Sequence, residues 1–462
     1  MMKCGGRTAA LFILCAGMVG GCVSGPGAVR SVLTKIDDAR EGDHDSPEKA
    51  FQVEFSGGTE TSGPIVLRTG ENSPAFVTLD GRGGTLKLRG LGSLLTVGPG
   101  LTLELRNITL RGREKNTASL VRVMEGGRLI LGRGALITGN ETSSSGGGVY
   151  VAGGSLILEG GEIRENRVVG TRAGGGGVYG EGSGAALILR NGAISDNGVS
   201  AVRGGGGGVY LIGNGVEFTM TGGEIRGNSV SVTGPVVSGG GVHLVGNGAR
   251  FVMRSGVIRD NRIASSASAS GGGVYLGLGD FIMTGGRISG NGLWFSAASV
   301  AGGGVHVNNG NFTLSGGYLV DNTASKGGGV YITNGAFTSE APAEQRARGA
   351  SRQDAGGDGA ENSVAGRGAE RSAGPEGAGN GEKLAIKNGS LVLSGGEITG
   401  NNASIGGGVY LERGLFIMNA GRIRSNTALL SGGGVHAERG TFTRLGGDLG
   451  GNAGKNGPDL YP

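Results

Sequence analysis

The sequence predicts an all-β fold: a right-handed parallel β-helix (β-solenoid) of about twelve coils, with three short strands in each coil. Three observations predict this fold. Gly accounts for 107 of the 462 residues, yet there are only 10 Pro and no Gly-X-Y period, which excludes collagen. A Gly-Gly-Gly-Val-[Tyr/His] string recurs along the chain. The interval from its valine to the Ile or Leu that follows is always even, which keeps both apolar side chains on the same side of a strand.

Each copy of the repeat has a fixed part and a variable part. The valine is followed 14 or 16 residues later by Ile or Leu in every uninterrupted copy, and an Asn comes three residues after that. An even interval keeps both apolar residues on one side of a period-two strand. Only the stretch from the Asn to the next valine varies freely, so we expect three strands and one variable loop per coil. The valines are Val149, Val178, Val209, Val242, Val274, Val305, Val330, Val409 and Val435.

The recurring asparagines are expected to form a structural ladder at one corner of the solenoid. Asn tolerates a left-handed bend, and its amide both donates and accepts hydrogen bonds to the turn and to the next coil. The triple glycines are expected at a second corner, where positive φ or close backbone approach excludes a Cβ. The ladder residues are Asn140, Asn166, Asn197, Asn228, Asn261, Asn291, Asn322, Asn401, Asn426 and Asn452.

Residues 1–21 predict a signal peptide. A short basic segment precedes an apolar stretch, residues 8–18, which is too short to span a bilayer. The string Val-Gly-Gly-Cys that ends at Cys22 resembles a lipobox, so we expect cleavage before Cys22 and a lipid on its thiol. The other two cysteines lie within the signal peptide, and the mature chain is therefore expected to contain no disulfide.

Composition divides the rest of the chain into five segments. Residues 22–63 predict a lipidated tether and N-terminal cap, and residues 64–140 predict N-terminal coils that lack the triple glycine. Residues 141–340 carry the GGGV[Y/H] repeats. Residues 341–383 are rich in Gly, Ala, Glu and Arg and contain no aromatic residue, which predicts a disordered insertion. Residues 384–462 predict C-terminal coils and a cap.

The repeats resemble those of polymorphic outer-membrane-protein type β-helices, which combine a GGA[I/V/L] motif with an FxxN motif. The resemblance covers about residues 64–452, with Ile-x-x-Asn here in place of Phe-x-x-Asn. It implies surface display and adhesion or interaction with a host or the environment. Because Cys22 is the expected membrane attachment, we expect a lipid-anchored protein of the outer membrane or cell surface, with the periplasmic face as the alternative.

Catalysis is not expected from the acidic residues. Glycoside hydrolysis needs two carboxylates across one groove, and a lyase needs clustered acids for Ca²⁺. Asp196, Asp260 and Asp321 each precede a ladder Asn, but successive members are two coils apart, and we expect them to form turns. No cofactor is expected. The alternatives are a carbohydrate-active β-helix enzyme (a lyase or glycosidase) and a passive envelope protein.

Metal and nucleic-acid binding are not expected either. His243 and His306 are separated by the coil of Tyr275, and two strand spacings of about 4.8 Å are too wide for one zinc ion. His44 lies in an acidic stretch that predicts a solvated linker. The formal net charge is only +5, without a basic stripe interleaved with aromatics, which argues against nucleic acid. We expect a monomer.

Two features are candidates for binding a host or matrix protein or a glycan. One is the outward row of Tyr and His beside the repeat valines, which could stack against sugars or only stabilise neighbouring strands. The other is the set of long loops after the asparagines; one holds Trp294 and Phe295, and an exposed Trp is a favoured recognition anchor. The row consists of Tyr150, Tyr179, Tyr210, His243, Tyr275, His306 and Tyr331.

Overall fold

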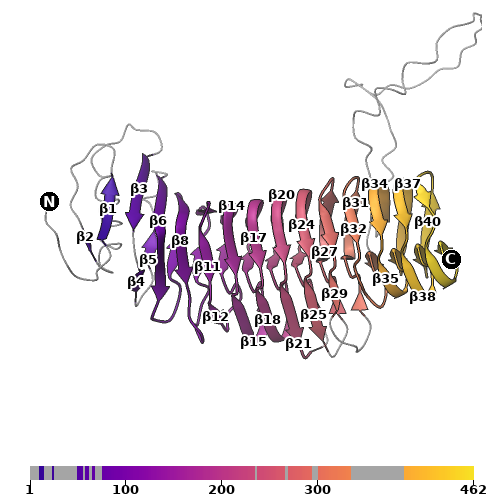
Figure 1. Ribbon diagram of the computed structural model, residues 1–462, viewed down its shortest axis with the longest axis horizontal. Coiled ribbons are helices and arrows are strands. Elements are labelled where there is room, and N and C mark those ends of the chain that lie inside the picture. Colours follow the sequence, from indigo (N-terminus) through magenta and orange to yellow (C-terminus); the bar gives the residue numbers. More distant parts are fainter. Residues whose placement is uncertain are drawn as a thin grey trace, which may run out of the picture.

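The computed structural model describes residues 10–14, 23–24, 49–55, 58–61, 65–67, 75–234, 237–265, 269–293, 300–333 and 390–462. These residues form strands and no helix. Figure 1 shows the strands stacked along one axis into a rod, with the N-terminal strands at one end and the C-terminal strands at the other. The prediction of an all-β parallel solenoid is confirmed, and the solenoid has about ten turns.

Each turn from residue 146 onward begins with a strand that follows a triple glycine, and the strand at residues 121–123 takes the same position without one. Val149 lies opposite Val178 in the next turn, and Tyr150 lies opposite Tyr179, so equivalent residues stack without slip. This register follows from the repeat, because a slip of one residue would move the valines out of the core. The first strands are β9 (Val121–Val123), β13 (Val149–Ala152), β16 (Val178–Glu181), β19 (Val209–Ile212), β23 (Val242–Val245), β27 (Val274–Met283), β31 (Val305–Leu314), β33 (Val330–Thr333), β36 (Val409–Leu411) and β39 (Val435–Ala437).

The second strand of most turns is longer than expected. In several turns, the segments that the sequence predicts as the second and third strands form one bent strand, with register shifts on either side of Glu159 in the first such turn. The small Gly-Gly pair bends the backbone while pairing with the next turn resumes beyond it. The bent strands are β14 (Ser155–Arg164), β17 (Ala186–Ser195), β20 (Glu217–Arg226), β24 (Arg250–Arg259), β34 (Ser390–Thr399) and β37 (Gly414–Arg424). In the other turns the same stretch holds shorter strands, which are β10 (Arg128–Leu131), β11 (Leu136–Thr138), β28 (Arg287–Ser289), β32 (Tyr318–Val320), β40 (Gly440–Arg444) and β41 (Asp448–Leu449).

The stretch after most ladder asparagines, expected to be a loop, is largely strand; after Asn322 it forms only isolated bridges. Val168, Val199 and Val230 each lie two residues after a ladder Asn and are buried in a second, smaller apolar cluster. Burial of these valines favours stacking of the stretch in register with the next turn. The strands are β12 (Glu141–Thr142), β15 (Arg167–Gly174), β18 (Gly198–Gly205), β21 (Ser229–Val232), β22 (Val237–Ser238), β25 (Arg262–Ser265), β26 (Ala269–Ser270), β29 (Gly292–Leu293), β30 (Val300–Ala301), β35 (Asn402–Ile405), β38 (Thr427–Ser431) and β42 (Ala453–Asn456).

A continuous apolar column fills the interior of the solenoid. Phe218, Phe251, Phe281 and Phe312 are fully buried and stack with centroids 4.4 to 4.6 Å apart. Each such aromatic pair contributes about 0.5–1.5 kcal/mol beyond the area it buries. The valines that follow the triple glycines and the isoleucines that precede the ladder asparagines line the same interior.

The stack continues at both ends and across the long insertion. β33 pairs with β36, and Phe312 of β31 lies opposite Leu391 of β34, although 79 residues separate Asn322 from Asn401. The remaining strands are β1 (Ala10–Leu14), β2 (Val23–Ser24), β3 (Lys49–Phe55), β4 (Gly58–Thr61), β5 (Ile65–Leu67), β6 (Ala75–Leu88), β7 (Leu95–Val97), β8 (Leu101–Arg111) and β43 (Leu460–Tyr461). Within this set, β1 pairs antiparallel with β2 and β3.

Several sequence predictions fall on other parts of the chain. Cys22, most of the predicted signal peptide, the insertion 341–383, Trp294 and Phe295 all lie outside the described residues. They therefore stay predictions.

Candidate functional site

The triple glycines form the expected corner. The first glycine of each triplet has a positive φ, 75° at Gly146 and 64° at Gly175. A Cβ on the second glycine, Gly147, would lie 2.3 Å from the carbonyl oxygen of Gly176 in the next turn, and one on Gly148 would lie 2.8 Å from that of Gly177. Backbones of successive turns approach too closely here for any side chain, so the glycines are structural.

The asparagines form a buried ladder. Asn197 Nδ2 donates to Asn228 Oδ1 at 3.0 Å and to the carbonyl oxygen of Ile163 at 2.9 Å, and the same contacts recur along the rod. The ladder begins one turn earlier than expected, because Asn116 Nδ2 donates to Asn140 Oδ1, and Asp459 accepts from Asn452 at the far end. Every amide is satisfied internally, which leaves none of them for a ligand.

The left-handed bend of this corner belongs to the residue before the Asn, not to the Asn itself. Asp196, Asp260 and Asp321 have φ values of 56°, 55° and 54°. In the turn after Asp196 the equivalent residue is Gly227, whose Cβ would lie 2.4 Å from Asp196 Oδ1. Asp260 and Asp321 lie in the same way beside Gly290 and Gly400, so each of the three carboxylates covers a glycine of the next turn.

Two of these carboxylates, those of Asp196 and Asp260, are paired with arginines. Arg226 lies 3.5 Å from Asp196 and 3.1 Å from Glu224, and Arg259 donates to Asp260 at 2.8 Å. Among the described residues, no group of three or more His, Cys, Asp or Glu side chains is placed to hold a metal ion.

The Tyr/His row stacks along the rod. Ring centroids are 5.6 Å apart for Tyr150 and Tyr179, 5.3 Å for Tyr179 and Tyr210, and 4.2 Å for Tyr210 and His243. The row continues through Tyr275, His306, Tyr331, Tyr410, His436 and Tyr461. From Tyr150 to His243, neighbouring rings, or Arg122 above Tyr150, therefore cover the ring faces, and this part of the row offers edges rather than faces. His306 differs, because its ring is tilted by 59° to both neighbours. This geometry favours strand stabilisation over sugar stacking.

The row is less exposed than an outward position suggests. His243, His306 and Tyr331 are buried, whereas Tyr150, Tyr179, Tyr210 and Tyr275 are partly exposed. The strands that follow the asparagines cover the row. A Cβ on Gly174 of β15 would lie 2.7 Å from the Tyr210 ring, and one on Gly205 of β18 would lie 2.8 Å from His243 Nδ1.

Burial controls the ionisation of the row. Loss of water lowers the pKa of His243 to about 4, partly opposed by its contact with the carbonyl oxygen of Ser238, and lowers that of His306 to about 3. Burial, with the Glu181 carboxylate as its hydrogen-bond acceptor, raises the pKa of Tyr150 to about 12. The histidines are therefore neutral at physiological pH.

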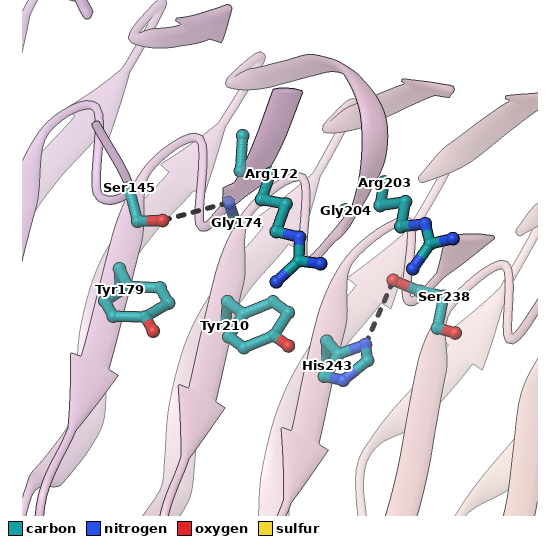
Figure 2. Close-up of a pocket in the computed structure, with 10 residues that line it drawn as sticks. Ser145, Arg172, Gly174, Tyr179, Arg203, Gly204, Tyr210, Ser238 and His243 are labelled. Atoms are coloured by element: carbon teal, nitrogen blue, oxygen red, sulfur yellow. Dashed lines mark hydrogen bonds between the residues drawn. The ribbon is translucent and has the colours of Figure 1, made fainter. Parts of the chain in front are cut away.

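One hollow opens beside this row, between the first and third strands of neighbouring turns. Its volume is about 340 Å³, and Figure 2 shows two arginines reaching toward the rings from β15 and β18, the strands that follow the ladder asparagines. Small residues at the edge of these strands leave the space open. The described residues that line it include no acidic side chain and are Ser145, Arg172, Ala173, Gly174, Tyr179, Arg203, Gly204, Tyr210, Ser238 and His243.

The sequence pattern predicts Tyr179, Tyr210 and His243 as candidates but does not single out the two arginines of this hollow. Arg172 and Arg203 lie opposite each other on β15 and β18. Both occur six residues after a ladder Asn, so an alignment of the repeats on their asparagines would have revealed them. They were missed because the stretch was expected to be a variable loop without a shared register.

Within the described part of the chain, no helix is long and apolar enough to cross a membrane. Comparison of the chain with protein-family models, curated proteins and solved structures found no match in any of the three.

Proposed function

We propose that this protein is a non-catalytic binding protein, held to a membrane by a lipid and acting in adhesion or interaction through its solenoid and the segments on its surface. The observation that carries the proposal is the arginine-rimmed hollow. The Asn ladder, the triple glycines and the aromatic row all hold successive turns together, whereas the side chains of Arg172 and Arg203 make no hydrogen bond or ion pair with any described residue.

The attachment and location rest on the sequence. A lipid on Cys22 would tether the rod at its N-terminal end, and durable anchoring follows from several acyl chains because each buried CH₂ contributes about 0.8 kcal/mol. The resemblance of the repeats to polymorphic outer-membrane-protein type β-helices supports an outer-membrane or cell-surface position. A periplasmic orientation is the alternative.

The handedness of the solenoid, its number of coils and its strands per coil are part of the same proposal. We take the solenoid to be right-handed, because crossovers between parallel strands are right-handed in about 98% of cases. A total of about twelve coils is supported by β5 to β8, which extend the stack beyond the ten turns. The description of three strands per coil is supported in turns such as β13, β14 and β15.

A binding panel with a product assay tests the function. The full-length protein would be incubated with immobilised neutral and acidic glycans and with matrix proteins, and the supernatants assayed for released sugar. We expect saturable binding to at least one ligand class without release. Release of reducing or unsaturated sugar ends would show a carbohydrate-active enzyme, and absence of binding to every class would favour a passive envelope protein.

A further inference from the structure

Arg172 and Arg203 form a pair of like charges on adjacent strands. They lie directly opposite each other in the parallel pairing of β15 with β18, and both side chains are exposed. Like charges in this arrangement repel and destabilise the sheet. Within the described chain, neither guanidinium makes a hydrogen bond or an ion pair. The fold therefore holds two positive charges together at a cost that an anion would relieve.

The surroundings of the two arginines suit a small polar ligand. A volume of about 340 Å³ falls within the range of small-molecule sites, roughly 300–1,000 Å³. The Ser145 hydroxyl oxygen accepts a hydrogen bond from the Gly174 amide at 3.3 Å, so its own proton is available to donate. The Tyr210 and Ser238 hydroxyls also line the hollow. Figure 2 shows both guanidinium groups directed toward this row of polar atoms.

The geometry disfavours two other classes of ligand. A peptide most readily adds to a sheet as an extra strand, but β15 already pairs with β12 and β18, and β16 with β13 and β19, so no strand edge is open at the hollow. A flat aromatic ligand needs a free ring face, and the faces of Tyr179 and Tyr210 are covered by neighbouring rings.

A carboxylated or sulfated sugar meets every feature of the hollow. Guanidinium groups bind planar carboxylates and sulfate-like oxyanions through paired, charge-assisted hydrogen bonds. The hydroxyl groups of a sugar ring can exchange hydrogen bonds with Ser145, Ser238 and Tyr210. We propose that Arg172 and Arg203 bind the acidic group of one sugar unit in an anionic polysaccharide. This inference rests on the proposed binding function and specifies one ligand class for it.

The test measures binding of the full-length protein to four polymers: polygalacturonate as the carboxylated probe, dextran sulfate as the sulfated probe, neutral dextran and polyglutamate. The test variant is Arg172→Gln/Arg203→Gln. The control is Arg413→Gln/Arg439→Gln, which removes the same charge from two exposed arginines at equivalent positions of adjacent turns, beside Glu412 and Glu438. Biolayer interferometry at two salt concentrations gives the affinities.

We expect polygalacturonate, dextran sulfate or both to bind, and neutral dextran to bind at least tenfold more weakly than the acidic polymer that does. The two probes distinguish a carboxylate from a sulfate. The test variant should weaken acidic-polymer binding by roughly tenfold or more, as loss of charge-assisted hydrogen bonds implies, while the control stays within about twofold of the wild type. The thermal midpoint of the test variant should stay equal or rise, because a repulsion has been removed.

Three results would overturn the assignment. The first is an unchanged affinity in Arg172→Gln/Arg203→Gln, or no binding of either acidic polysaccharide. The second is arginine-dependent binding of polyglutamate alone, which would show an acidic-peptide site. The third is a lowered thermal midpoint, which would show that the arginines serve the fold. If the wild type binds neutral dextran or a matrix protein but neither acidic polysaccharide, the first of these results applies to this site, and the proposed binding function still stands.

Discussion

Asn228 donates both its backbone N–H and its side-chain amide to Oδ1 of Asn261 in the next turn, at 3.1 and 3.0 Å. The same Asn228 accepts two hydrogen bonds from Asn197 of the turn before. The Asn228 side chain therefore links its own turn to the turn before and to the turn after. This relationship makes the ladder the element that fixes the turns against one another.

Removing one member of the ladder should destabilise the rod. Asn228→Ala leaves the donors of Asn197 and the carbonyl oxygen of Ile194 buried without partners, and each such group costs about 1–3 kcal/mol. We expect a loss of about 3 kcal/mol or more, measured as a shift of the urea midpoint. Asn247→Ala, at an exposed turn, is the control and should change stability by less than about 0.5 kcal/mol. Equal midpoints for the two variants would refute the structural role of the ladder.

The thermal midpoint of a Gly→Ala variant should depend on whether the glycine lies in the triple-glycine corner. In Gly207→Ala the new Cβ would lie 2.5 Å from the carbonyl oxygen of Gly240, so the backbone must shift and the thermal midpoint should fall. Gly198→Ala is the matched control, because its nearest neighbour is the Ser229 hydroxyl at 3.4 Å, an ordinary contact. A Gly207→Ala midpoint as high as that of Gly198→Ala would show that the turns are not closely packed there.

The buried histidines predict loss of stability in acid. Their pKa values are lowered from 6.5 to about 4 for His243 and about 3 for His306. Between pH 6.5 and about 4 the unfolded chain binds protons that the folded chain does not, so stability falls as the pH drops through this window. For His243 the full effect is about 3 kcal/mol, at about 1.36 kcal/mol per pKa unit. Thermal melts across pH 4–7 measure it.

His243→Tyr provides the control for that window, because Tyr occupies the equivalent position in most repeats and does not titrate below pH 7. The variant should lose a large part of the pH dependence. If wild type and variant show the same slope between pH 4 and 6.5, the titrating groups lie elsewhere.

The predicted lipid gives a separate test of attachment. Cys22→Ser removes the only thiol that can carry the acyl chains, so the protein should move from the membrane pellet to the soluble fraction, and the mass of its N-terminal peptide should lack the lipid. Cys15→Ser, inside the predicted signal peptide, is the control and should leave the protein in the pellet. A Cys22→Ser protein that stays in the pellet would refute lipid anchoring through this residue.

The repeat allowed much of the fold to be predicted, and its register explains why. The even spacing of Val209 and Ile225 predicts both in the interior, where they lie, and the positions of the asparagines predict a ladder; in the structure these side chains are hydrogen-bonded from turn to turn. The strand after each Asn was not predicted, because those stretches differ in length. The single buried residue that each contributes, such as Val199, is too weak a pattern to distinguish a strand from a loop.

The candidate site was predicted only in part. The sequence placed Tyr179 and Tyr210 in one row, but it could not show that their faces cover each other, since this depends on the stacking distance. It also could not bring Arg172 and Arg203 together, because that requires the unexpected pairing of β15 with β18. Residues positioned by repeat spacing were thus predictable, and residues positioned by the packing of variable segments were not.

The central claim, an anchored rod that meets its ligand outside the cell, is tested most directly by protease access in intact cells. A protease site would be inserted into residues 341–383, the segment whose composition predicts disorder, and cells expressing the full-length chain would be treated before and after lysis. Surface display predicts cleavage in intact cells, with a periplasmic marker protein left uncut. Protection in intact cells followed by cleavage after lysis would contradict surface display.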